Sequence, residues 1–210
     1  MQISDNKAAI GIGTLIIFIA MIMVAGMAAS VIIQTMNTLQ EQAMTTGEQT
    51  TRDISTGLRV TQISGYYDGT SITQLAIFVK TTAGSDDVDL MYAYISLSDA
   101  STQVILNYTT SCFSSSVSGG LFGTLDSSIL SATTYGIMKV RDIDDSCSSN
   151  DPSINSDDLV VLLINATDCF SGINTRTDIS GSIVPEQGIS GVIRFTTPSA
   201  YVNTIVELQT

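Results

Sequence analysis

The feature that most constrains this chain is an uncharged, strongly apolar segment near its N-terminus. Residues 8–40 contain no aspartate, glutamate, lysine or arginine, and residues 10–33 are almost entirely aliphatic, methionine or small. A helix of this composition has no polar face, so it must be surrounded either by other protein or by lipid. The segment is also long enough to cross a bilayer, which takes roughly 20 residues.

The same helix is expected to continue into a second, amphipathic section. From residue 32 the apolar positions follow one another in steps of three or four residues, which keeps them on one helical face. This stripe consists of Ile32, Met36, Leu39, Ala43, Gly47, Thr50 and Ile54. No proline interrupts the pattern, which therefore predicts one helix over residues 9–55 with Gly57 as its C-cap. At about 1.5 Å per residue the helix would be roughly 70 Å long.

Three interpretations of the apolar half are open: a permanent transmembrane anchor, a secretory signal peptide, and an assembly helix that packs against copies of itself. A signal peptide is disfavoured because its apolar region usually spans about 7–15 residues and ends in a cleavage site. Here the pattern continues into the amphipathic section without a loop. Such a helix is too long for one compact domain, so its apolar half needs lipid before assembly and other copies afterwards.

Composition excludes several classes of function. The chain has no histidine and a net charge of −12. Without histidine, Ser-His-Asp and Cys-His catalysis and most zinc sites are ruled out, although carboxylate and lysine chemistry stay open. The acidic surface repels phosphate backbones, which argues against nucleic acid as a partner.

From residue 58 onward the apolar pattern changes to a period of two, which is typical of β-strands. Alternation is clear over residues 73–81, 89–98, 135–141 and 201–209. Residues 159–164 are continuously apolar, which indicates a central strand covered on both faces. The fold class predicted is α+β, with one long N-terminal helix followed by an antiparallel, Ig-like β-sandwich.

Both ends of the chain resemble one protein family. Residues 9–21 read AIGIGTLIIFIAM, and Val-Ala and Ala-Ala pairs follow at 24–25 and 28–29. Residues 45–51 (TTGEQTT) and 191–198 (GVIRFTTP) add to the likeness. These segments resemble the archaellins, the archaeal flagellins related to type IV pilins. The resemblance implies a non-enzymatic subunit that polymerises through its helix into a swimming filament.

The resemblance also implies a short leader, removed by a type-IV-pilin-like peptidase between Ala8 and Ala9. It divides the chain into a leader at 1–8, a polymerisation helix at 9–56 and a surface β domain at 57–210. Lys7 supplies the basic residue ahead of the junction, although the family commonly has more basic residues and a glycine where Ala8 stands. Bacterial pilins usually carry a glutamate where this chain has Gly13, which favours the archaellin interpretation.

The partners implied are other copies of the chain, in a homopolymer or in a heteropolymer with related subunits, together with the leader peptidase and a membrane assembly motor. The subunit would lie in the cytoplasmic membrane before assembly and in an extracellular filament afterwards. Two rival interpretations are an adhesive archaeal pilin and a membrane-anchored enzyme or binding module with an extracellular β domain. Lipid-free filaments would distinguish a polymer from the anchored alternative.

Particular residues on the helix are candidates for contact between copies. Gly11 and Gly13 begin like a dinucleotide-binding motif, but Ile16 occupies the third glycine position and no strand precedes them. Small residues in apolar surroundings let helices approach closely, although these could also be incidental helix positions. The candidate assembly residues are Gly11, Gly13, Leu15, Phe18, Ile19, Ile22 and Gly26.

Four aspartates cluster between residues 141 and 152, where oxygen ligands could hold Ca²⁺. They are Asp142, Asp144, Asp145 and Asp151. The glycine and terminal glutamate of an EF-hand are missing, so a solvated acidic loop is the favoured interpretation and a structural Ca²⁺ ion is the alternative. No organic cofactor is expected.

Two glycosylation sequons and three cysteines fit an exported domain. The sequons begin at Asn107 and Asn165. The cysteines are Cys112, Cys147 and Cys169, an odd number that permits at most one internal disulfide. Export makes a disulfide from Cys147 to either of the others plausible, and the sequence does not choose between them.

Overall fold

The structure is a computed structural model that describes residues 3–125 and 127–209, with side chains described from residue 10 onward. The chain divides into two compact units, residues 1–50 and residues 51–210. The first unit is helical, and the second contains the end of that helix and all the strands. The predicted leader at 1–8 extends outside the described residues, and the division into leader, polymerisation helix and surface domain stays a prediction.

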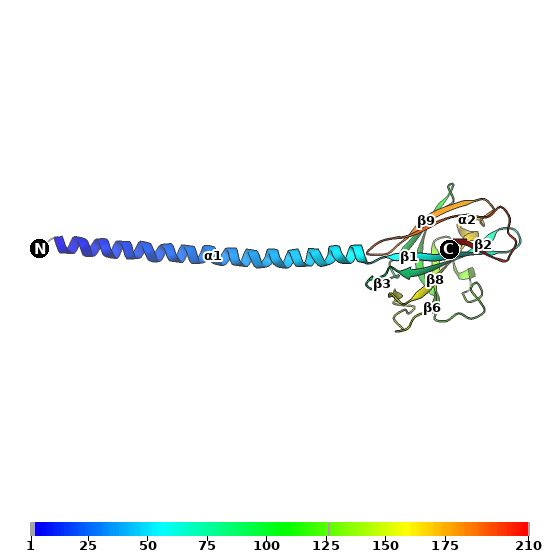
Figure 1. Ribbon diagram of the computed structural model, residues 1–210, viewed down its shortest axis with the longest axis horizontal. Coiled ribbons are helices and arrows are strands. Elements are labelled where there is room, and N and C mark those ends of the chain that lie inside the picture. Colours follow the sequence, from blue (N-terminus) through cyan, green and yellow to red (C-terminus); the bar gives the residue numbers. More distant parts are fainter. Residues whose placement is uncertain (1–2, 126, 210) are drawn as a thin grey trace. The chain divides into compact units, whose positions relative to one another are not determined.

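Helix α1 runs without interruption over Ile3–Ser55 (Figure 1). Its composition permits this continuity, because alanine, methionine and glutamine are frequent in it and none of its residues is a proline. The expected start at Ala9 is therefore too late as a structural boundary, since the backbone is already helical through Ala8 and Ala9. The amide of Thr56 donates to the carbonyl of Arg52 at 2.8 Å, which closes the final helical turn.

Gly57 does not act as the expected C-cap. It lacks the positive φ of a left-handed cap and instead forms an isolated parallel bridge with Ile189. A Cβ atom at Gly57 would lie 2.9 Å from the Cβ of Ile189. The glycine is thus required by the close approach of two backbones, which a local sequence pattern does not reveal.

The second unit is built on one large sheet. Among the described residues, nine strands form a single sheet in the order β10-β9-β4-β5-β6-β8-β2-β1-β11. All neighbouring pairs are antiparallel except β5 with β6. A two-stranded sheet of β3 and β7 accompanies it. The strand bounds are β1 Leu58–Tyr67, β2 Ile72–Thr81, β3 Val88–Asp89, β4 Tyr94–Ser98, β5 Gln103–Ser114, β6 Thr134–Arg141, β7 Ser153–Ile154, β8 Leu159–Asn165, β9 Asp178–Val184, β10 Gly191–Thr196 and β11 Ile205–Gln209.

The large sheet curls until its two ends meet. The amide of Leu58 donates to the carbonyl of Ile189 at 2.9 Å, and the amide of Ile189 donates to the carbonyl of Thr56 at 2.9 Å. The amide of Arg194 on β10 donates to Oε1 of Gln209 on β11 at 3.1 Å. The predicted fold class, a long helix followed by a largely antiparallel β domain, is confirmed. The facing layers expected of a sandwich belong here to one continuous sheet.

Two apolar clusters stabilise this unit, one on each face of its central strands. In β8, Val160, Leu162 and Ile164 join the larger cluster, whereas Val161 and Leu163 join the smaller one. All five side chains are fully buried. This confirms that the continuously apolar segment at 159–164 is a central strand covered on both faces.

Two other predicted strands differ from the structure. The segment 89–98 is divided into β3 and β4 by a turn, in which Oδ1 of Asp89 accepts a hydrogen bond from the amide of Met91 at 2.7 Å. The hydroxyl of Tyr135 donates to the carbonyls of Leu90 and Ala93 at 3.2 and 3.0 Å, which holds that turn from another strand. The segment expected at 201–209 is strand only from Ile205.

A short helix, α2 (Ala166–Phe170), and a 3-10 turn, η1 (Ser127–Ile129), complete the β domain. Asn165 is the N-cap of α2, with its side-chain oxygen accepting hydrogen bonds from the amides of Thr167 and Asp168. Helix α2 thereby begins directly at the end of β8.

Candidate functional site

Exposed apolar side chains cover the first part of α1. Every large apolar residue from Ile10 to Ile33 leaves between 50% and 72% of its surface exposed, with Ile19 at the lower limit and Met21 at the upper. Ile10–Ser55 meets the length and composition of a membrane-spanning helix, with a mean hydropathy of 2.8 in its most apolar window and none of that window buried. Surface of this kind marks a site of contact with lipid or protein.

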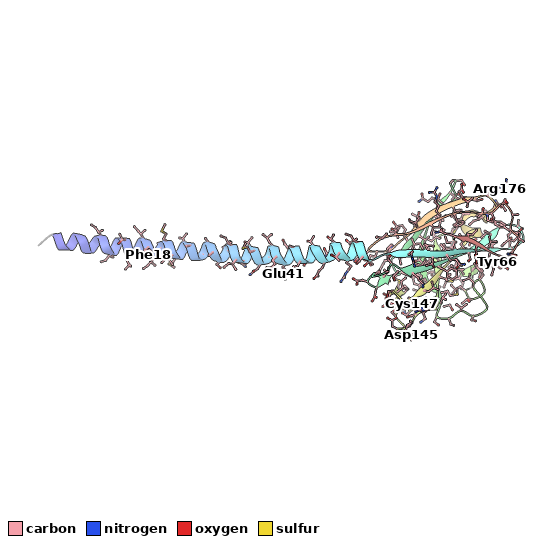
Figure 2. All side chains as sticks on the ribbon, in the orientation of Figure 1. Phe18, Glu41, Tyr66, Asp145, Cys147 and Arg176 are labelled. Atoms are coloured by element: carbon pink, nitrogen blue, oxygen red, sulfur yellow. The ribbon has the colours of Figure 1, made fainter. Side chains whose placement is uncertain are left out.

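The predicted assembly residues all lie on this exposed surface. Leu15, Phe18 and Ile22 leave 59%, 62% and 55% of their surfaces exposed, and Phe18 projects freely from the helix in Figure 2. Among the described residues, nothing lies within 4 Å of a Cβ atom built on Gly11, Gly13 or Gly26. The helix therefore offers both bulky side chains and flat positions to a neighbour. Their predicted role between copies stays a prediction.

Threonine hydroxyls along α1 satisfy their hydrogen bonds within the helix itself. Thr14 donates to the carbonyl of Gly11 at 2.9 Å, and Thr35 donates to that of Val31 at 2.8 Å. Thr38, Thr45 and Thr50 do the same with the carbonyls four residues earlier. Because these hydroxyls already have acceptors, burying them in an apolar environment does not leave an unsatisfied donor. The helix can thus enter lipid or a dry protein core despite its threonines.

The acidic loop that follows β6 brings together a different set of carboxylates from the one predicted. Asp142, Asp144 and Asp158 each place a carboxylate oxygen within 4.8 Å of the others. Asp145 lies apart, and its Oδ1 is 3.0 Å from Nζ of Lys139. Asp151 is exposed and is not part of the group. The predicted set is therefore corrected: two of its members belong to the cluster, and Asp158 replaces the other two.

Asp158 lies close to the predicted set in the sequence but is not one of the expected ligands, and its environment is unusual. Its Oδ2 accepts hydrogen bonds from the amide of Asn155 at 2.9 Å and the hydroxyl of Ser146 at 3.4 Å. Its Oδ1 has no hydrogen-bond partner among the residues that the structure describes, although Asp158 is fully buried. A buried carboxylate oxygen without a partner is costly unless something compensates its charge. The available signal was its position directly before the apolar strand, which places it at the edge of the core.

The two buried carboxyls of this cluster have pKa values shifted in opposite directions. Burial raises the pKa of Asp158, and the nearby charges of Asp142 and Asp144 raise it further. Burial would also raise the pKa of Asp142, but hydrogen bonds from the Lys139 ammonium and the Cys147 amide outweigh it and lower that pKa overall. The charged form of Asp142 is thus favoured by its surroundings, whereas the charged form of Asp158 is disfavoured.

The predicted disulfide is not formed by the cysteines, all three of which the structure describes. All three are buried, but Cys112 lies in the smaller apolar cluster whereas Cys147 and Cys169 lie in the larger one. Burial raises the pKa of the Cys147 thiol to about 12 and that of Cys169 to about 11. These thiols are therefore kept protonated and unreactive in the folded domain.

The two predicted glycosylation sites differ in accessibility. Asn107 is exposed on β5. Asn165 is half-buried, and its Nδ2 donates to the carbonyl of Ser127 at 3.2 Å and to Oδ2 of Asp168 at 3.1 Å. N-glycosylation joins the glycan to the side-chain Nδ2 of asparagine, so modification of Asn165 would disturb the cap of α2. The geometry therefore favours Asn107 and assigns Asn165 a structural role.

Comparison with known proteins places these features in a family. The family model described as archaeal-type flagellin matches residues 8–195. Flagellin B2 of Methanocaldococcus jannaschii is 39% identical over 211 residues, which cover 99% of this chain and 97% of that protein. Flagellin B4 of Pyrococcus abyssi is 39% identical over 217 residues, covering 97% of this chain and 99% of that protein.

Solved structures give the same picture of the fold. The crystal structure of archaeal flagellin FlaB1 from Methanocaldococcus jannaschii has a TM-score of 0.67 and 33% sequence identity, covering 73% of this chain and 97% of that one. The archaeal flagellum of Methanospirillum hungatei has a TM-score of 0.64 at 16% identity, covering 95% and 99% of the two chains. The second likeness concerns the fold alone.

Proposed function

This chain belongs to the archaeal-type flagellins and is a structural subunit of the archaellum filament, and on this premise we propose that it polymerises through the apolar half of α1. In the filament, the helices pack against one another in a dry core and the β domain forms the outer surface. The subunit itself catalyses no reaction, since its part in swimming is to build a rigid polymer.

The observation that carries this proposal is the unsatisfied apolar surface of α1. Large side chains such as Phe18 and Ile22 are more than half exposed, whereas the β domain buries a core of apolar residues within itself. Each buried aliphatic or aromatic side chain contributes about 1.5–3 kcal/mol. Packing many such side chains against other copies therefore provides a strong driving force for assembly.

The same surface leads us to propose an order of events before assembly. The chain lies first in the cytoplasmic membrane, with α1 in the bilayer, because isolated apolar helices are stable there. A leader peptidase removes residues 1–8 at the Ala8–Ala9 junction, and a membrane motor then adds the subunit to an extracellular filament. The described side chains begin after that junction, so the processing step rests on the sequence.

Purification of filaments sheared from cells tests the function directly. We expect this chain in thin filaments that sediment without lipid, and we expect N-terminal sequencing to begin at Ala9. Recovery of the chain only as a detergent-soluble membrane monomer would contradict the polymer. Recovery of Met1 in intact filaments would contradict the processing step alone.

We also propose that Asp142, Asp144 and Asp158 hold a structural cation, with Ca²⁺ the ion best suited to carboxylate oxygens. The unpartnered Oδ1 of Asp158 is the specific observation that favours this over a solvated loop. A divalent ion would compensate the charge of the buried carboxylate and brace the loop after β6. The ion would have a structural role, and no reaction step depends on it.

A glycan on Asn107 is the remaining proposal for the surface. The residue is exposed, and its sequon continues through Tyr108 to Thr109. Intact-mass measurement of filaments from cells, compared with filaments of an Asn107→Gln variant, tests it. An unchanged mass in the variant, apart from the substitution itself, would contradict it.

A further inference from the structure

Two cations of the β domain face each other, and no salt bridge to either is found in the part of the chain that the structure describes. Arg59 on β1 and Lys80 on β2 are direct partners in the antiparallel register. Arg59 is exposed and Lys80 is half-buried. Neither belongs to any of the salt bridges found among the described residues. Like charges directly opposite each other destabilise a strand pair, so this cation pair is a cost to the isolated subunit.

An acidic pocket lies in the same unit, near the start of β1. Four carboxylates line it, those of Asp86, Asp87, Asp89 and Glu186. The volume of the pocket is about 170 Å³. The cation that lines it is Arg52, whose Nε is 3.1 Å from Oδ2 of Asp86. The other exposed carboxylates, Asp87 and Glu186, belong to no salt bridge among the described residues. The pocket thus carries an excess of negative charge.

A buried hydroxyl in this pocket also lacks a partner. Thr56 lines the pocket and is only 3% exposed, yet its Oγ1 makes no hydrogen bond to any described residue. Leaving a buried polar atom unsatisfied costs about 1–3 kcal/mol. A donor that enters the pocket from outside the chain would remove this cost. An ammonium group suits the task, because it carries three donors on a flexible stem.

We propose that the acidic pocket of one subunit receives the cation pair, Arg59 and Lys80, of a neighbouring copy in the filament. The contact presupposes the assembly proposed above and adds a lateral bond between β domains. It relieves the repulsion within the cation pair and offers a donor to Thr56. It also offsets the repulsion between copies that each carry a net charge of −12.

A second copy fits better than an unrelated partner because of the symmetry of the contact. The pocket and the cation pair consist of different residues of one chain. Each subunit can therefore offer its cation pair to one neighbour and its pocket to another. Such a heterologous contact leaves a free patch at each end, and it generates an open helical polymer when the rotation between copies does not close a ring. Neither patch can pair with its own copy, because like charges would meet. A filament needs this kind of contact, whereas a closed dimer does not.

Charge reversal in cells that make only this chain tests the contact. We expect Arg59→Glu with Lys80→Glu to lower the number of filaments per cell about tenfold, and Asp87→Lys with Glu186→Lys to do the same. The combined four-residue variant restores complementary charges and the original net charge, so filaments should return. Failure of either reversal to lower the filament number, or of the combination to restore it, would overturn the contact.

A matched control separates the contact from overall charge. Arg176→Glu with Arg194→Glu changes the net charge by the same amount as reversal of the cation pair, but neither residue lines the pocket. Arg176 lies at the end of the β domain opposite to β3 in the figures. We expect normal filaments from this control. An equal loss of filaments would assign the effect to net charge and overturn the contact.

Cysteine cross-linking gives a readout that does not depend on filament number. Lys80→Cys with Asp87→Cys should yield covalent multimers on mild oxidation of filaments, whereas each single variant should yield none. The native thiols are buried and should not contribute. Filaments that form normally but give no multimers would overturn the contact while leaving the filament function intact. Loss of membrane-inserted subunit in the cation reversal alone would assign that patch to lipid headgroups and also overturn it.

Discussion

Ile19 in α1 and Ile77 in β2 are the same residue type, yet Ile19 leaves 50% of its surface exposed whereas Ile77 leaves none. The same contrast separates the apolar half of α1 from the core of the β domain. Apolar side chains in the β domain bury one another, so this domain supplies its own stability. Those of the apolar half of α1 are exposed, so they are available to stabilise an assembly.

The largest effect is expected from substitutions in α1 that prevent assembly and leave the β domain unchanged. Ile19→Asp or Ile22→Asp should abolish filaments, because a carboxylate at either position meets lipid before assembly and apolar side chains afterwards. Either environment costs several kcal/mol to accommodate a charge. Cells carrying the variants should be non-motile and without filaments by electron microscopy. Ile19→Val is the matched control, and normal filaments from Ile19→Asp would contradict the assembly role.

The next largest effect is expected from a substitution in the core of the β domain, which lowers the free energy of unfolding of that domain. Leu162→Ala removes a fully buried side chain from the central strand β8 and should lower the free energy of unfolding by about 2–5 kcal/mol. Ile22→Ala removes a comparable side chain from the exposed helix and should leave β-domain unfolding unchanged. Urea unfolding followed by circular dichroism compares the two variants. Equal destabilisation by both would show that the helix belongs to the same cooperative unit.

A smaller effect is expected at the acidic loop. With chelator present, the raised pKa of Asp158 means that the folded chain holds its proton more tightly than the unfolded chain. The free energy of unfolding should therefore fall as pH rises from the ordinary value of 3.8 through the folded pKa. Asp158→Asn should remove this contribution. Thermal unfolding at several pH values measures it.

The same variant separates a cation site from a solvated loop. Added Ca²⁺ should raise the free energy of unfolding of the unsubstituted chain by about 1–3 kcal/mol near saturation. It should have little effect on Asp158→Asn. Asp145→Asn is the matched control, because Asp145 lies outside the cluster and should keep the response. Identical stabilisation of all three chains would contradict the site.

The smallest effect distinguishes two asparagines within the β domain. Asn165→Ala removes the N-cap of α2 and should lower the free energy of unfolding by about 1 kcal/mol. Asn107→Ala should change it very little when the chain carries no glycan, because Asn107 is exposed. Chemical unfolding of unglycosylated protein compares the two. A larger loss at Asn107 would assign that residue a structural role as well.

Much of this protein follows from the sequence alone. The uncharged segment at residues 8–40 requires an apolar environment. Because it contains no proline, it can form one uninterrupted helix. The resemblance to archaellins, based on residues at both ends, is confirmed by the family match. The strand at 159–164 could be recognised as central, because only a strand covered on both faces is apolar at every position. The resemblance rests on the motifs at residues 9–21, 45–51 and 191–198, whereas the other conclusions depend on composition and spacing, which are local properties.

Only the tertiary structure decided which distant groups meet. Asp158 joins Asp142 and Asp144 because β8 and the loop after β6 come together, and no spacing in the sequence indicates this. The register of β1 with β2 sets Arg59 against Lys80, and the curl of the sheet brings Ile189 to Gly57. The cysteines are divided between two clusters by the sheet that separates them. Local patterns fix which face of an element is apolar, but contacts between elements depend on pairing and curvature, which the whole sheet determines together.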